Sequence, residues 1–252
     1  MTSRAMRFPS AFTRIELLVV VVVLLVLLTL ATLLLPGLAR AKAKATRISC
    51  INNQKEIGTA YRLWANDNGD LVPPQQIQSK GGWKDLLART NLGPICFTNY
   101  AIMHREFGES PKLVICPSDE RQAASDFTNH FSNLSVSYFV GVSANDVYPQ
   151  SIFGGDRNLG PGSVPANDYG YSPSNGMGND VAVPIVGPTC WSLKMHSDGN
   201  TAGAGNILLG DGSAQQVSSA SFHMNWLRNA EPTTNRPAGH APSVPSIRLV
   251  FP

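Results

Sequence analysis

The residues best suited to chemistry lie towards the C-terminal end of the chain. Residues 196–200 read HSDGN, and Asp211 and Gly212 follow after a short apolar run. The side-chain oxygens of Asp198, Asn200 and Asp211 are the kind of ligand that Ca²⁺ takes. Asp and Asn beside Gly also close turns by bonding to their own backbone, and the ligand spacing of an EF-hand is absent. The sequence therefore offers a calcium site and a set of turn caps as alternatives.

Motifs of the familiar enzyme classes do not occur in the sequence. The five histidines are scattered and never form the H-E-x-x-H pair of a zinc hydrolase. There is no Gly-x-Ser-x-Gly elbow, no Walker loop and no dinucleotide-binding fingerprint. We therefore expect a protein that is not an enzyme and that uses no cofactor, apart from the Ca²⁺ alternative above.

The four cysteines are Cys50, Cys96, Cys116 and Cys190. Outside the cytoplasm they could form up to two disulfides, in three connectivities. No two of them form a C-x-x-C pair, so the sequence gives no support for a zinc ribbon or a thioredoxin-type site. Free buried thiols are the alternative to disulfides.

A run of 19 residues without charge, from Leu17 to Leu35, is long enough to span a membrane. Only Thr29 and Thr32 are polar within it. As a helix it covers about 28 Å, close to the thickness of the hydrocarbon core of a bilayer. Glu16 at its edge would cost about 2–3 kcal/mol in lipid unless the carboxylate finds a partner. A helix that docks against another subunit provides that partner, whereas a plain anchor has no use for the charge.

A processing motif surrounds this glutamate. Residues 11–18 read AFTRIELL, and Arg4 and Arg7 precede them. A basic leader, a small residue, Phe-Thr-x-x-Glu and a long apolar helix together resemble the signature of type IV prepilins and type II secretion pseudopilins. Ala11 stands where that family usually has Gly, and it is small enough to be cut. The alternatives are an ordinary signal anchor and a secretory signal peptide, although the apolar run is longer than a signal peptide needs.

The resemblance implies a processing step and an assembly contact. A prepilin peptidase would cut between Ala11 and Phe12 and methylate the new terminal amine of Phe12. Glu16 would pair with the terminal amine of a neighbouring subunit. The protein would cross the inner membrane once, with its globular part in the periplasm, and would then enter a pseudopilus or surface filament. Its partners would be the peptidase, other pilin or pseudopilin subunits, the inner membrane, and the secretion or pilus assembly platform.

Further segments resemble a pseudopilin-like group found in bacteria of the Planctomycetes and Verrucomicrobia type. Residues 47–58 read RISCINNQKEIG, residues 66–69 read NDNG, and residues 116–119 read CPSD. His196 followed by Asp211 and Gly212 resembles a degenerate form of the C-terminal motif of that group. The likeness is firm over residues 1–70 and thinner beyond them.

The same resemblance bears on the two open questions of metal and disulfide. Cys50 and Cys116 both lie in motifs that resemble the group, so we expect a disulfide between them. Related secretion pseudopilins bind calcium in a C-terminal loop, which supports Asp198, Asn200 and Asp211 as calcium ligands.

Periodicity and turn residues predict the elements. One helix is expected over residues 13–65, because Ile57, Tyr61 and Trp64 share an apolar face and residues 66–70 end it. Beyond it, the following is expected: strands at 112–115 and 136–140, a hairpin joining 206–209 to 213–217, a surface loop that is structured or partly mobile over 142–181, a short helix at 222–228 and a loose tail from 231.

The expected fold class is α+β and pilin-like, with a long N-terminal helix on a small antiparallel β-sheet domain that carries long loops. The predicted organisation is a leader over 1–11, a transmembrane or filament-core helix over 12–37, an amphipathic continuation over 38–66, a β-rich domain over 67–230 and a Pro-rich tail over 231–252.

Charge and composition exclude one class of partner. The formal net charge is +3, and loss of residues 1–11, with two arginines and no acidic residue, lowers it to +1. This is not the footprint of a nucleic-acid-binding protein. The sequence therefore predicts a structural subunit of a type IV pilus-like or type II secretion pseudopilus filament. The alternative is a membrane-anchored minor pilin that acts as an adhesin or ligand-binding module.

Overall fold

The computed structural model describes residues 13–85, 96–142, 148–175, 183–185, 187–197, 202–222 and 247–252. The chain divides into two compact units, Met1–Lys44 and Ala45–Pro252. Helix α1 (Arg14–Asp67) contributes to both units, and it confirms the helix predicted over residues 13–65.

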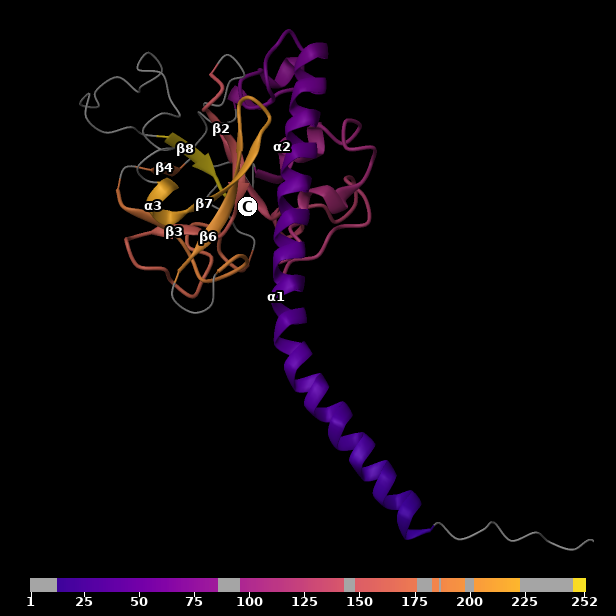
Figure 1. Ribbon diagram of the computed structural model, residues 1–252. Coiled ribbons are helices and arrows are strands. Elements are labelled where there is room, and N and C mark those ends of the chain that lie inside the picture. Colours follow the sequence, from indigo (N-terminus) through magenta and orange to yellow (C-terminus); the bar gives the residue numbers. More distant parts are fainter. Residues whose placement is uncertain are drawn as a thin grey trace, which may run out of the picture. The chain divides into compact units, whose positions relative to one another are not determined.

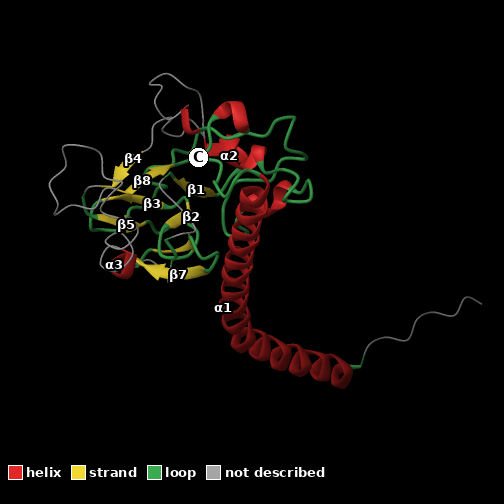
Figure 2. Ribbon diagram, turned by 90° about the horizontal axis from the view of Figure 1, so that it is seen from above, coloured by secondary structure: helices red, strands yellow, loops and turns green. Residues whose placement is uncertain are grey.

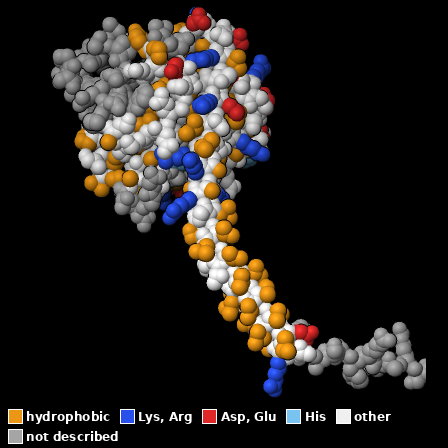
Figure 3. Space-filling model, in the orientation of Figure 1, with side chains coloured by type: hydrophobic (Ala, Val, Ile, Leu, Met, Phe, Trp, Pro, Cys, Tyr) orange, Lys and Arg blue, Asp and Glu red, His pale blue; other side chains and the backbone are white. Residues whose placement is uncertain are grey.

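In the first unit α1 presents apolar side chains to its surroundings on every side. The helix continues through Pro36, and no part of its most apolar stretch is buried. The two polar residues bond within the helix, since Thr29 donates to the carbonyl of Val26 and Thr32 to that of Thr29. A helix that satisfies its own polar groups suits a lipid environment. Figure 3 shows the apolar side chains covering this part of α1, and its length and composition fit a single membrane anchor.

The second unit is built on an antiparallel six-stranded sheet with the strand order β4-β8-β1-β2-β6-β7. Its strands are β1 (Tyr138–Gly141), β2 (Ile152–Asp156), β4 (Val183–Ile185), β6 (Ala204–Leu209), β7 (Ala214–Ser218) and β8 (Ile247–Val250). A second sheet pairs β3 (Leu159–Pro161) with β5 (Thr189–Trp191). Short helices α2 (Cys96–Ile102) and α3 (Ser219–Ser221) and three 3₁₀ turns complete the described elements. Figure 1 shows the part of α1 that belongs to this unit running beside the sheet.

Both faces of the main sheet are covered. Ile57, Tyr61 and Trp64 are buried, as their spacing predicted, and they share one core cluster with Phe153 and Leu208 of the sheet. The rings of Tyr61 and Phe153 lie 5.0 Å apart, centre to centre.

A second cluster covers the other face of the sheet. It lies on the alternate residues of the strands and includes Phe139, Ile207 and Leu249 together with Trp191 of β5. Figure 2 shows the strands on one side of the part of α1 that belongs to this unit. The observed architecture is therefore α+β and pilin-like, as expected.

The segment predicted as a surface loop over 142–181 contains a central strand instead. β2 lies between β1 and β6 with every residue buried. The prediction was wrong because the glycines of this segment allow close packing between strands and do not form a turn. A Cβ on Gly155 would lie 2.6 Å from the ring of Phe139 and 2.8 Å from the carbonyl oxygen of Asn206. Only glycine leaves room for that ring against the strand.

Two further predictions were wrong. Residues 112–115 do not form a strand, because Pro111 at the first position starts a 3₁₀ helix over Pro111–Val114. The tail is not loose at its end, since β8 pairs with both β1 and β4 and Phe251 is fully buried.

The other element predictions fared better. The hairpin around the Asp-Gly turn is confirmed as β6 and β7, and the strand over 136–140 is confirmed as β1. The helix predicted at 222–228 lies outside the described residues, apart from Phe222.

Replacing Gly155 by Ala should destabilise the protein by about 1–3 kcal/mol, because the added methyl group must displace the ring of Phe139 or the neighbouring strand. Thermal unfolding of the detergent-solubilised chain, followed by tryptophan fluorescence, would measure the change. Gly187→Ala is the matched control: no atom lies within 4 Å of its added Cβ, so its midpoint should stay close to wild type. Equal midpoints for the two variants would show that the close approach at Gly155 carries no weight.

Candidate functional site

The predicted processing residues, Ala11 and Phe12, lie outside the described residues. Glu16 lies within the described residues, and its exposed carboxylate caps the N-terminus of α1. Its Oε2 accepts hydrogen bonds of 2.8 Å from both the backbone N–H and the hydroxyl of Thr13, while its own N–H donates to the Thr13 hydroxyl at 3.3 Å. This reciprocal pair is a capping box. In the single chain, the first turn of its own helix therefore serves as the partner that Glu16 needs.

The predicted calcium ligands are only partly described. Asp198 and Asn200 lie outside the described residues. Asp211 is exposed in the turn between β6 and β7, and its Oδ1 accepts a 2.8 Å bond from the N–H of Ser213. Arg62 donates to its backbone carbonyl. Asp211 thus closes a turn, as the alternative reading of its Asp-Gly context required, and the calcium site stays a prediction.

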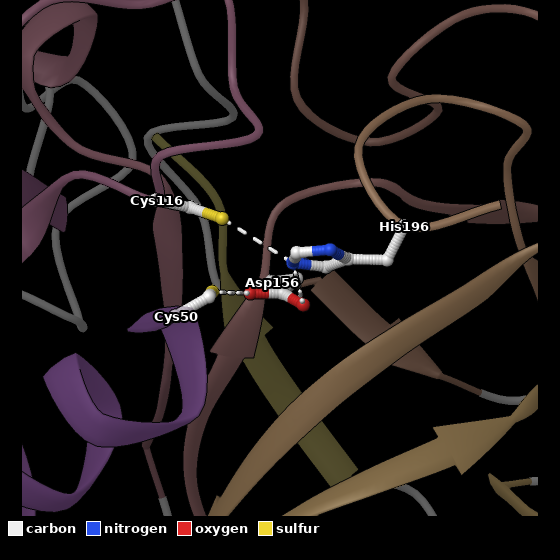
Figure 4. A group of neighbouring side chains, drawn as sticks. All are labelled: Cys50, Cys116, Asp156 and His196. Carbon is white, nitrogen blue, oxygen red and sulfur yellow. Dashed lines mark hydrogen bonds and ion pairs between the residues drawn. The ribbon is translucent and has the colours of Figure 1, made fainter. Parts of the chain in front are cut away.

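The structure brings together four side chains, Cys50, Cys116, Asp156 and His196, of which the sequence connected only Cys50 and Cys116. All four are buried, and their sulfur, oxygen and nitrogen atoms lie within 4.8 Å of one another. Figure 4 shows them pointing into one small space from four separate segments. We call this set the Cys-His-Asp cluster.

Each member is positioned by a different element. Cys50 lies on α1 seven residues before Ile57, so both face the sheet. Cys116 follows the 3₁₀ helix that Pro111 starts, and Asp156 ends the central strand β2. His196 comes from a tight turn in which its N–H donates to the carbonyl of Lys194.

The turn before His196 is strained. Met195 between the bonded residues has a φ of 64°. A non-glycine residue in that conformation costs free energy that the surrounding structure must offset, and such residues gather at functional sites. The surrounding fold therefore positions the imidazole of His196 although the backbone of Met195 disfavours this turn.

Asp156 is the hub of the cluster. Its Oδ1 accepts from Cys50 Sγ at 3.2 Å and from Gln54 Nε2 at 2.9 Å. Its Oδ2 accepts a 2.6 Å bond from the backbone N–H of Asn206 and lies 3.4 Å from Nε2 of His196. The same Nε2 lies 3.2 Å from Cys116 Sγ.

The buried charges shift the pKa of each member. Burial raises the pKa of Asp156 and of Cys50. Burial opposes ionisation of Cys116 too, but hydrogen bonds with Cys50 and His196 outweigh it and lower the pKa of the Cys116 thiol to about 7. The pKa of His196 is raised, because Asp156 and Cys116 overcome the effect of burial. The neighbours of Cys116 and His196 thus make the thiol easier to ionise and the imidazole easier to protonate.

This geometry does not suit nucleophilic catalysis. A catalytic histidine accepts from the nucleophile on one ring nitrogen and donates to a carboxylate from the other. Here Cys116 and Asp156 both approach Nε2 of His196. The sulfur of Cys116 is also buried, so a substrate has no approach to it. What the cluster can offer is a set of donors converging on one point: two sulfurs, one nitrogen and one carboxylate.

The expected disulfide partners are neighbours in this cluster. Cys50 and Cys116 contact each other, and both are free thiols in the structure. Cys96 and Cys190 are free as well. The proximity satisfies what the expected pairing needs, and the disulfide itself stays a prediction.

An ion pair beside the cluster supports it. Arg157, the residue after Asp156, holds both oxygens of Asp119 at 2.7 and 2.8 Å and is fully buried. Its guanidinium also lies 3.4 Å from the ring centre of Tyr169. Burial alone would raise the pKa of Asp119, but the bonds and charge of Arg157 lower it. The CPSD segment therefore contributes twice. Cys116 is a member of the cluster, and Asp119 forms the ion pair with Arg157 beside it.

The cluster could not be found from spacing. Cys50 and Asp156 are 106 residues apart, and Cys116 and His196 are 80 apart. The usable signal was that three members lie in short motifs, namely 47–58, 116–119 and 196–200. Shared membership in such motifs pointed to Cys50 and Cys116, but not to Asp156, whose segment read as a loop.

Comparison with known proteins gives no relative from which a role could be transferred. No family model, no curated protein and no solved structure matches this chain.

Replacing Asp119 by Asn should destabilise the protein by about 3–5 kcal/mol, because it leaves the charge of the buried Arg157 without its partner. Glu120→Gln is the matched control: it removes a carboxylate 3.8 Å from the same guanidinium, but one whose side chain is 58 % exposed. Exposed pairs contribute about 0–1 kcal/mol, so this control should unfold near wild type. Thermal unfolding of both variants would measure the difference. Similar midpoints would contradict the prediction that the buried Arg157–Asp119 pair stabilises the fold more than the exposed Glu120 contact.

Proposed function

We propose that the protein is a subunit of a type IV pilus-like or type II secretion pseudopilus filament. The observation that carries the proposal is α1 itself. Its 54 residues begin as an apolar helix with exposed side chains and end as a helix packed on an antiparallel sheet. That division suits a protein whose first segment lies in lipid before assembly and against other helices afterwards.

The exposed apolar surface supports this proposal physically. Leu33 and Leu34 are 78 and 70 % exposed in the single chain, and the apolar residues before them are similarly uncovered. A contiguous apolar surface of this extent marks a membrane or protein contact. Lipid covers it in a stored subunit, and the helices of neighbouring subunits would cover it in a filament.

Glu16 provides the proposed assembly contact. Its carboxylate is already bonded to Thr13, so in the single chain it is not bare. A neighbouring terminal amine would add an opposite charge in a place of low dielectric constant, where such a pair is strong once both charges have already lost their water. The contact would fix the axial position of one helix against the next.

The alternative role, an adhesin or ligand-binding tip, would be favoured by exposed aromatic side chains over residues 142–181. Within the described part of that range Tyr148 is exposed, whereas Phe153 and Tyr169 are buried. One exposed tyrosine is weaker support than the extended apolar surface of α1, so the filament subunit is the function that we propose.

The processing step can be tested first. Co-expression with a prepilin peptidase should yield a mature chain that starts at Phe12 and carries one additional methyl group, as read by intact mass and N-terminal sequencing. Expression without the peptidase is the control and should leave the Met1 start. A Met1 start in both cases would leave an ordinary anchor and remove the basis for a filament subunit.

The assembly contact can be separated from helix capping. Glu16→Gln can keep the capping box, which accepts Glu or Gln, but it removes the charge. Glu16→Ala removes both. If the charge pairs with a neighbouring amine, both variants should be cleaved normally and both should fail to form filaments, as judged by electron microscopy of sheared fractions.

Two outcomes would count against the charge. If Glu16→Gln forms filaments while Glu16→Ala does not, the residue acts as a helix cap only. If both variants form filaments, the residue has no part in assembly.

A further inference from the structure

We propose that Cys50, Cys116, Asp156 and His196 form a structural Zn²⁺ site that joins α1 to the sheet. The proposal rests on the geometry and chemistry of the Cys-His-Asp cluster, and it does not depend on the filament function proposed above.

The spacing of the donor atoms fits a tetrahedral ion. Zinc lies about 2.3 Å from thiolate sulfur and about 2.0–2.1 Å from nitrogen or oxygen, so neighbouring donors sit about 3.3–3.8 Å apart. The contacts from Cys116 Sγ to His196 Nε2, from Cys50 Sγ to Asp156 Oδ1, and from His196 Nε2 to Asp156 Oδ2 measure 3.2, 3.2 and 3.4 Å. All donors lie within 4.8 Å of one another, so only small movements are needed to enclose an ion.

The direction of the side chains supports a metal over a chain of hydrogen bonds. Nε2 of His196 is approached by a sulfur and by a carboxylate oxygen at once. One ring N–H cannot serve both partners well, whereas a cation at that point would be shared by all of them. Figure 4 shows the four side chains converging in this way.

A metal cation could balance the charge of the cluster in place of the proton that His196 would otherwise carry. Asp156 is fully buried, and burying a carboxylate is costly unless an opposite charge compensates it. Thiols are only weak hydrogen-bond donors, so Cys50 compensates it little. A divalent ion would be the compensating charge for Asp156 and for two thiolates, and Arg47, which acts electrostatically on Asp156, would offset the remainder.

The donor types select the metal and its role. Two thiolates favour Zn²⁺ over the hard cations Ca²⁺ and Mg²⁺, which take oxygen ligands. Four protein ligands fill a tetrahedral shell and leave no position for water or substrate, which is the mark of a structural zinc site. It shares no ligand with the Ca²⁺ site expected at Asp198, Asn200 and Asp211.

Further groups already hold the ligands in place. Gln54 Nε2 and the N–H of Asn206 donate to Asp156. The N–H of Ser118 donates to Cys116 Sγ at 3.4 Å, and the Tyr138 hydroxyl lies 3.4 Å from Cys50 Sγ. Such outer contacts orient metal ligands and tune their affinity.

The proposal can be tested on the full chain, purified in detergent without chelator or reductant. Mass-spectrometric metal analysis should find about one Zn²⁺ per chain. X-ray absorption at the zinc edge should show two sulfurs at about 2.3 Å and two lighter ligands at about 2.0–2.1 Å. Replacing the metal with Co²⁺ should give the visible bands of tetrahedral thiolate coordination, a readout that needs no variant.

Variants locate the site. Cys116→Ser and Asp156→Asn should lose the bound zinc, and removal of zinc with a strong chelator should lower the melting temperature of wild type but not of Cys116→Ser. Cys190→Ser is the matched control, because it removes a buried thiol outside the cluster and should keep both the zinc and the effect of the chelator.

Three outcomes would overturn the proposal. One is a chain without zinc whose thiols stay free even after incubation with Zn²⁺. Another is a purified chain that carries a Cys50–Cys116 disulfide, because the same two sulfurs cannot then serve as thiolate ligands. The third is zinc that Cys116→Ser and Cys190→Ser retain equally, which would place the metal elsewhere.

Discussion

The buried carboxylate of Asp156 is the constraint on which the second unit depends. It ends the central strand β2 with no exposed surface, and an isolated carboxylate cannot be left there without compensation. Its partners come from α1, through Cys50 and Gln54, from β6, through the N–H of Asn206, and from the strained turn that carries His196. Satisfying one side chain therefore fixes the axial position of the helix on the sheet. A shift of α1 by one turn would remove both of its contributions together.

The close packing of the sheet follows from covering both of its faces. α1 takes one face and the β3–β5 layer takes the other, so the central strands are buried along their length and do not alternate between apolar and polar residues. Gly154 and Gly155 let β2 approach Phe139 on its neighbouring strand. The end of this strand and the residue after it then place Asp156 and Arg157 in two adjacent polar clusters, one around His196 and one around Asp119. The strand with two adjacent glycines is thus also the one that leads into the polar core.

The sequence was most informative where a single local rule decides the structure. Apolar spacing predicted α1 and its buried face, and the Asp-Gly turn predicted the β6–β7 hairpin. It failed where tertiary contacts override local preference. Gly154 and Gly155 suggested a loop, because the ring that occupies the space beside them belongs to Phe139 on another strand. The prolines before β8 suggested a loose tail, because β8 is stabilised only by pairing with β1 and β4. The Cys-His-Asp cluster is of the same kind, since its members meet only after the sheet and the helix have packed.

The polar groups along α1 show how one helix can serve two environments. Thr29 and Thr32 bond to carbonyls of the same helix, so the apolar segment needs nothing from its surroundings. Gln54, by contrast, bonds to a residue 102 positions away and is fixed for as long as the second unit stays folded. Glu16 is the intermediate case, because its bonds to Thr13 are local and exposed. An exposed local bond can be exchanged for a partner of opposite charge at little cost, whereas the bonds around Asp156 cannot be exchanged without unfolding. The assembly contact proposed for α1 therefore belongs at Glu16, and the permanent attachment of the helix belongs at Cys50 and Gln54.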